Sequence, residues 1–237
     1  MDELVAFHSR KPTTARPLLG VTVLVVEDSL YACDALRLMC LHSGARLRRA
    51  DCIDSARRHL KVYRPGVIIV DLGLPDGSGA DLIADLADAK PRIGAILGTS
   101  GDAFAEDVAL AAGADGFLSK PLDSLGVFQH TMVSCLPPDL QVSGLYVASV
   151  GSVRPDPMAY RDDLEHAAAL LSEKHDSGTL SYILQFLSGL AKSADDNPLL
   201  KAVETVGALP ERQRLSHPAV AKISAIVQDR MSDMAPV

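Results

Sequence analysis

The sequence predicts an α/β domain built on a parallel sheet, followed by a small domain made only of helices. Over the first 135 residues, short runs of β-branched and small apolar residues alternate with segments of helical pattern. Residues 67–70 (Val-Ile-Ile-Val) are apolar without interruption, which is typical of a strand buried on both faces. After residue 156 apolar residues recur only at helical spacing, so the second domain is expected to be all-α.

Strands and helices of the first domain are expected in strict alternation. Because parallel strands joined by helices need right-handed crossovers, helices should cover both faces of the sheet. Gly44 is expected to end the first helix and Pro65-Gly66 the second. The predicted strands are 21–26, 45–50, 67–70, 93–98 and 116–119, and the predicted helices are 29–42, 54–63, 79–88, 103–112 and 122–135.

Four amphipathic helices are expected in the second domain, where they can form a small bundle. Asp156-Pro157 is an N-cap followed by proline at the first helical position, which starts the first helix. The second carries an apolar stripe from Leu180 to Leu190, and the others start at Asn197-Pro198 and at Ser216-His217-Pro218. The predicted organisation is a flexible leader (1–17), the α/β domain (18–136), a linker (137–155), in which 141–150 has some β character, and the helical bundle (156–237).

Composition narrows the class of protein. A net charge of −7 over 237 residues argues against broad, nonspecific attraction to nucleic acid or to an anionic membrane. The four cysteines form no Cys-x-x-Cys pair, which favours a reduced compartment without a zinc or redox motif. The first residues are acidic and no apolar run approaches the length of a membrane span, so a cytoplasmic protein without membrane attachment is expected.

Carboxylates follow two of the predicted strands. Asp71 comes directly after strand 67–70, and Glu27-Asp28 directly after strand 21–26. In the flavodoxin-like strand order 2-1-3-4-5, the ends of the first and third strands border one crevice. Three carboxylates in one crevice repel one another unless a cation lies between them, and hard oxygen ligands suit Mg²⁺. The sequence therefore predicts a phosphoryl-transfer site at this edge of the sheet.

Two further strand ends carry side chains that suit a phosphoryl group. Thr99 follows the fourth predicted strand, where its hydroxyl can donate to a phosphoryl oxygen. Lys120 follows the fifth, where its ammonium can neutralise another oxygen. Each of these residues taken alone is more simply a helix cap, a turn residue or a surface lysine, and only their combination favours a site.

Four stretches together resemble the receiver domain of two-component response regulators. They are Val-Leu-Val-Val-Glu-Asp-Ser at 23–29, Ile-Ile-Val-Asp-Leu-Gly-Leu-Pro-Asp-Gly-Ser-Gly at 68–79, Thr99-Ser100, and Ala-Gly-Ala-Asp-Gly-Phe-Leu-Ser-Lys-Pro at 112–121. The resemblance covers residues 21–135 and implies a phosphoacceptor at Asp71, served by a sensor histidine kinase or a histidine phosphotransfer protein. It also implies a Mg²⁺ site formed by Glu27, Asp28, Asp71 and the backbone carbonyl of Gly73.

The resemblance assigns roles to the remaining residues as well. Thr99 would be the switch hydroxyl, with Ser100 as the alternative, and Lys120 the phosphoryl-binding cation. Phe117 would be the aromatic residue whose rotamer follows Thr99, and Lys120-Pro121 would be a cis peptide. Gly73 departs from the family, many members of which carry a bulkier residue there.

The function that phosphorylation would control through the helical domain has several interpretations. An interaction or dimerisation bundle, and so a homodimer, is favoured. DNA binding is less favoured, because acidic residues outnumber basic ones after Val153. A phosphotransfer bundle is disfavoured, because neither His166 nor His175 has lysine and glycine placed behind it. A Mg²⁺-dependent phosphohydrolase is a further alternative, but it would need an aspartate general acid where Gly73 stands. Apart from self-phosphorylation and slow autodephosphorylation, no enzymatic activity is expected.

Overall fold

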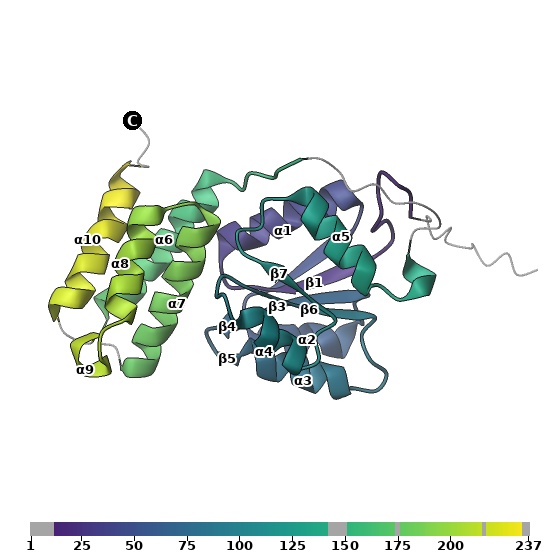
Figure 1. The fold of residues 1–237 in the computed structure, drawn as a ribbon, viewed down its shortest axis with the longest axis horizontal. Helices are drawn as coiled ribbons and strands as arrows, with labels where there is room; N and C mark the ends of the chain where they lie inside the picture. Colours follow the sequence, from purple (N-terminus) through teal and green to yellow (C-terminus); the bar gives the residue numbers. More distant parts are fainter. Residues whose placement is uncertain (1–11, 142–150, 174–175, 215–216, 234–237) are drawn as a thin grey trace, which may run out of the picture.

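The computed structural model describes residues 12–141, 151–173, 176–214 and 217–233. Within these ranges the chain forms an α/β domain and a helical domain that lie side by side (Figure 1). None of the helices in the described ranges is both long and apolar enough to cross a membrane.

The α/β domain contains a five-stranded parallel sheet with the strand order β2-β1-β3-β6-β7. This is the predicted 2-1-3-4-5 order, because the two-residue strands β4 (Gly73–Leu74) and β5 (Gly77–Ser78) form a separate hairpin. The strand β3 is central and all of its residues are buried, as its apolar run predicts. The strands are β1 (Thr22–Val26), β2 (Arg46–Ala50), β3 (Val67–Asp71), β6 (Ala95–Ser100) and β7 (Gly116–Ser119).

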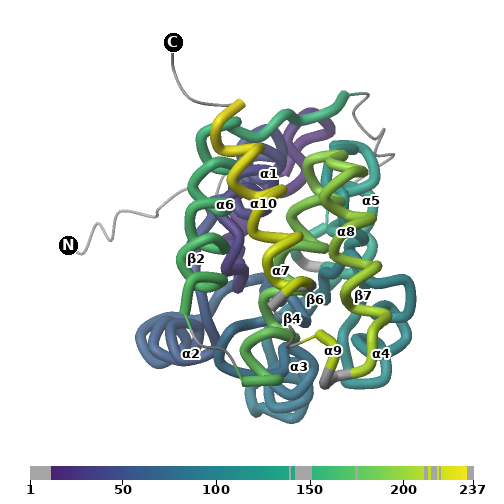
Figure 2. Tube along the Cα trace, turned by 90° about the vertical axis from the view of Figure 1, so that its left-hand side faces the viewer, coloured from purple at the N-terminus to yellow at the C-terminus, as the bar shows by residue number. Residues whose placement is uncertain are grey.

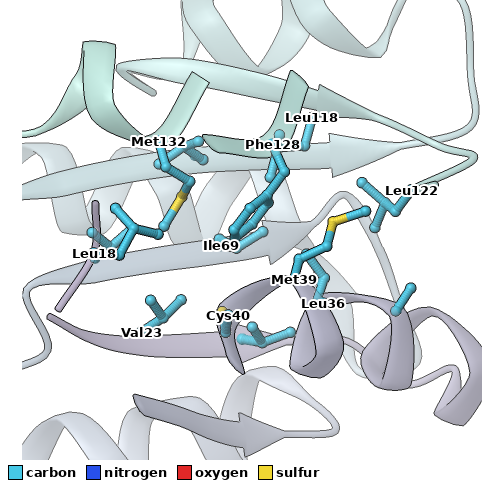
Figure 3. Close-up of a cluster of buried hydrophobic side chains, with 14 of the residues drawn as sticks. Leu18, Val23, Leu36, Met39, Cys40, Ile69, Leu118, Leu122, Phe128 and Met132 are labelled. Carbon is cyan, nitrogen blue, oxygen red and sulfur yellow. The ribbon is translucent and has the colours of Figure 1, made fainter. Parts of the chain in front are cut away.

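Helices cover both faces of this sheet. On one face α1 (Leu30–Ser43) and α5 (Leu125–Cys135) pack through Met39, Phe128 and Met132 onto Ile69 of β3 (Figure 3). The other face is covered by helices α2 (Ile53–Val62), α3 (Gly79–Asp88) and α4 (Ala105–Ala111).

Two elements differ from the predicted bounds in an informative way. The strand β6 runs to Ser100, so Thr99 and Ser100 belong to the sheet and do not follow it. The helix α5 begins at Leu125, three residues later than predicted, because the Ser124 hydroxyl accepts a hydrogen bond from the Val127 amide and caps the helix there.

The helical domain confirms the predicted bundle and adds one short helix. Its apolar stripes share one core, which includes Leu164, Leu187 and Ile223. Aspartates at 156, 176 and 196 cap the first three helices through their side chains. The helices are α6 (Pro157–Ser172), α7 (Ser177–Ser193), α8 (Asn197–Gly207), the short α9 (Glu211–Arg214) and α10 (His217–Asp233).

The end of the predicted linker attaches to the α/β domain. Val153 is buried in the core beneath α1 and α5, and its amide donates to the Asp123 carbonyl at 3.0 Å. Residues 138–140 form one 3-10 turn. Most of the β-like stretch 141–150 lies outside the described residues.

The helical domain packs against the edge of the α/β domain at which β1 and β3 end. Helices α6 and α7 both contact α1, and α7 also contacts β4. Figure 2 views the molecule from this side, with the bundle in front of the α/β domain. At the contact, the rings of Tyr31 and Tyr160 meet edge to face with centroids 5.6 Å apart.

Candidate functional site

Three carboxylates meet at the carboxyl edge of the sheet. Glu27 and Asp28 follow β1, and Asp71 is the last residue of β3. One oxygen of each side chain lies within 4.8 Å of the others, close enough for the three to hold a metal ion. The topology thus brings together residues separated by more than forty positions, as the order of β1 and β3 predicts.

Lys120, the residue after β7, lies beside these carboxylates. Its Nζ lies 2.8 Å from Glu27 Oε2 and 3.0 Å from Asp71 Oδ2. The lysine side chain is only 5% exposed, so the ammonium is held between the two carboxylates away from solvent. The Lys120–Pro121 peptide is cis, as the resemblance implies.

The loop after Asp71 is held by close backbone contacts. The Gly73 amide donates to Asp71 Oδ1 at 3.3 Å. A Cβ atom on Gly79 would lie 1.9 Å from the Asp71 carbonyl oxygen, so α3 can start this close to β3 only with glycine. Gly79 belongs to the stretch 68–79 that resembles the receiver family, and this close approach gives the physical reason for a glycine there.

The two candidate switch hydroxyls occupy different positions. Thr99 is paired with Asp71 in the sheet register and is fully buried, and its hydroxyl donates to the Leu118 carbonyl at 2.7 Å. Ser100 instead lines the cavity that contains Asp71 and Lys120. Phe117 is half-buried and packs with the core on the α3 and α4 side, so its predicted coupling to Thr99 stays a prediction.

Comparison with known proteins agrees with this geometry. Residues 23–130 match the family model described as the response regulator receiver domain. This part of the chain is a receiver domain. The structure's five-stranded parallel sheet is the flavodoxin-like fold expected of a receiver domain, and the family model does not extend into the helical domain.

Curated relatives match over the receiver domain. The chain is 38% identical over 101 residues to the KDP operon transcriptional regulatory protein KdpE of Escherichia coli, covering 42% of this chain and 44% of that protein. It is 33% identical over 102 residues to the probable transcriptional regulatory protein TcrX of Mycobacterium tuberculosis, covering 43% and 44%. The chain therefore spans less than half the length of these relatives.

Two solved structures are similar to part of the chain. One is the putative response regulator of Chloroflexus aurantiacus, with 28% identity, a TM-score of 0.41 and coverage of 43% of this chain and 85% of that one. Another is the receiver domain of a histidine kinase from Syntrophus aciditrophicus, with 23% identity, a TM-score of 0.46 and coverage of 54% and 99%.

Electrostatics in the receiver site favour a bound cation. Burial raises the pKa of Glu27 well above its usual value, the Asp71 charge raises it further, and Lys120 acts in the opposite direction. Burial also raises the pKa of Asp28. For Lys120 burial lowers the pKa, but Asp71 and Glu27 outweigh burial and raise it above the usual value. One ammonium faces three carboxyl groups, so a divalent cation would relieve the remaining repulsion.

The helical domain contributes side chains to the site that the sequence analysis did not identify. The Tyr182 hydroxyl donates to Asp28 Oδ2 at 2.7 Å, and Lys192 donates from its ammonium to the Gly101 carbonyl. A cavity of about 400 Å³ lies between the domains, and both Gln185 of α7 and Asp71 line it. No spacing in the sequence relates Tyr182 to Asp28, and the only signal was the unusual glycine at position 73.

Proposed function

We propose that the chain is a response regulator that accepts a phosphoryl group on Asp71 from a sensor histidine kinase or a histidine phosphotransfer protein, in a Mg²⁺-dependent reaction. The observation that supports this most directly is the position of Lys120, held between Asp71 and Glu27 beside a cavity. An ammonium there pairs with the nucleophile before transfer and is placed to pair with a phosphoryl oxygen after it.

The proposed metal site consists of Glu27, Asp28, Asp71 and the backbone carbonyl of Gly73. All four would offer oxygen atoms as ligands, and the three carboxylates lie close together, which fits a small hard cation. When bound, Mg²⁺ supplies positive charge that offsets the repulsion between the carboxylates and the incoming phosphoryl group.

The side chains of the receiver domain account for the transfer itself. An Asp71 carboxylate oxygen forms a bond to phosphorus while the bond from phosphorus to the donor nitrogen breaks, and that electron pair returns to the donor imidazole. Lys120 is placed to pair with the phosphoryl oxygens. Thr99 would exchange the Leu118 carbonyl for a phosphoryl oxygen, or Ser100, which already lines the cavity, would donate in its place.

For the helical domain we propose a protein-interaction or homodimerisation role controlled by this phosphorylation. DNA binding is the second candidate, because the relatives TcrX and KdpE are described as transcriptional regulatory proteins. Their similarity covers only 42 to 43% of this chain, and the family model ends at residue 130, before the helical bundle. A phosphohydrolase is not favoured, since Gly73 offers no general acid.

Labelling by a small phosphodonor tests the proposed reaction. Incubation with ³²P-acetyl phosphate and Mg²⁺ should label the chain, and the label should be released by hydroxylamine, as expected of an acyl phosphate. Chelation of Mg²⁺ with EDTA before the donor is added should reduce labelling to background. A chain that stays unlabelled with Mg²⁺ present would refute the proposal.

Mg²⁺ should also stabilise the folded chain in the absence of any phosphodonor. At a concentration 100 times its dissociation constant, the ion adds about 2.7 kcal/mol to the free energy of unfolding, which raises the melting temperature by several degrees. Asp28→Asn should lose most of this shift. Asp102→Asn is the matched control, because Asp102 lines the same cavity outside the carboxylate cluster and should keep it.

A further inference from the structure

The helix α7 lies against the receiver loops that border Asp71. A Cβ atom on Gly73 would lie 2.3 Å from the Gln185 side-chain nitrogen, so a larger residue there would collide with Gln185. A Cβ on Gly101, in the loop after β6, would lie 3.9 Å from the Gly189 Cα. The backbone of α7 thus passes close enough to the loop after β6 that a side chain at position 101 would touch it.

Polar contacts hold the helical domain against the receiver domain. Tyr182 donates to Asp28, a carboxylate of the acidic cluster itself. Asp163 of α6 occupies the N-terminus of α1, where its carboxylate accepts from the Ser29 hydroxyl at 2.7 Å and from the amides of Leu30 and Tyr31 at 2.9 and 3.0 Å. A buried carboxylate that receives three donors at a helix N-terminus is a strong contact. It joins residues of the two domains that lie 133 positions apart in sequence.

The position of α7 limits which phosphodonors can reach Asp71. The phosphorus atom of a donor must come within about 3 to 3.5 Å of the carboxylate oxygen, with the donor nitrogen that leaves on the far side of the phosphorus. A histidine carried on a folded protein brings its own backbone and neighbouring side chains to the same edge, which Gln185 and Gly189 of α7 already occupy. The cavity of about 400 Å³ has room for a small acyl phosphate.

We propose that the face of the helical domain formed by α6 and α7 competes with a protein phosphodonor for the phosphoacceptor edge of the receiver domain. The kind of partner that fits this edge is a helical protein that presents a phosphohistidine where α7 presents Gln185. Self-docking and donor docking exclude each other, so a protein donor acts only on the open fraction of molecules. This inference rests on the proposed function of Asp71.

A reversible disulfide tests the competition. Cysteines at 101 and 189 are chosen for this bond because a Cβ on Gly101 would lie 3.9 Å from the Gly189 Cα, and loss of both free thiols on oxidation shows that the bond has formed. The double variant Gly101→Cys/Gly189→Cys, with Cys52 and Cys135 changed to serine, is labelled when oxidised and again after reduction. The small donor is acetyl phosphate, and the protein donor is a phosphorylated histidine phosphotransfer domain selected because it labels the reduced form.

Oxidation should slow labelling by the protein donor at least tenfold and leave labelling by acetyl phosphate within about twofold. Equal rates from the protein donor in the oxidised and reduced forms would overturn the competition. If oxidation slows labelling by both donors equally, the crosslink blocks Asp71 itself. The proposal that the helical domain discriminates between donors is then also refuted. If neither acetyl phosphate nor any of the phosphotransfer domains screened labels the reduced form or the unmodified chain, the proposed function is refuted instead.

Tyr182→Phe provides a second test without a crosslink. It removes the hydroxyl that bonds Asp28 and keeps the ring in the helical core, so the open fraction and the rate from the protein donor should rise roughly tenfold. Tyr160→Phe is the matched control, because its hydroxyl bonds Asp196 within the helical domain. Hydrogen exchange of the α7 amides should accelerate in Tyr182→Phe and stay unchanged in Tyr160→Phe. Unchanged exchange and transfer in Tyr182→Phe would contradict the proposal.

Discussion

Replacing Asp71 with asparagine should abolish labelling of the chain by ³²P-acetyl phosphate in the presence of Mg²⁺. The amide has the same shape as the carboxylate but is not a nucleophile, so no acyl phosphate can form. The fold should survive, because Lys120 keeps its ion pair with Glu27 at 2.8 Å. The measurement is radiolabel per mole of protein, and intact mass should show the added phosphoryl group of about 80 Da only in the unmodified chain.

Two aspartates serve as controls for this substitution. Asp85→Asn changes an exposed residue of α3 that pairs with Arg57, and it should label normally. Asp102→Asn changes a residue that lines the cavity without joining the carboxylate cluster, and it should also keep most of its labelling. Substantial labelling of the Asp71→Asn protein, or its loss in Asp85→Asn, would contradict the assignment of the phosphoacceptor.

The strand ends were predictable from sequence because topology alone decides where they meet. An uninterrupted apolar run placed Asp71 at the end of a buried strand, and the flavodoxin-like strand order placed Glu27 after the end of the neighbouring strand. Chain connectivity, not side-chain packing, brings these residues together. The prediction therefore did not depend on rotamers.

The hydroxyl and interdomain contacts were not predictable in the same way. Whether Thr99 or Ser100 faces the cavity depends on where β6 ends, and strand ends are the least certain part of a pattern. The bond from Tyr182 to Asp28 depends on how two separate domains pack, which no periodicity within either domain records. Gly73 carried the only trace of that packing, since a glycine at this position leaves space for Gln185.

Lys120→Met should destabilise the receiver domain by about 3 to 5 kcal/mol, the usual cost of removing one member of a buried ion pair. Methionine fills a similar volume, so the loss reflects charge and not a cavity. Glu27 is fully buried, and without the ammonium its carboxylate faces Asp71 with no ion-pair partner in the described part of the chain. The expected readout is a lower urea midpoint of the receiver domain at neutral pH with Mg²⁺ chelated.

The response of the Lys120→Met protein to Mg²⁺ shows whether its lost stability comes from the missing charge or from altered packing. Saturating Mg²⁺ should recover part of the lost stability, because a divalent cation among the carboxylates replaces the missing positive charge. Lys61→Met, at an exposed position near the end of α2, should change the free energy of unfolding by less than about 0.5 kcal/mol with or without Mg²⁺. A Lys120→Met protein as stable as the unmodified chain would mean that the buried ammonium does not hold the carboxylates together, and its pairing with Asp71 would then give no support to a phosphoryl-transfer site.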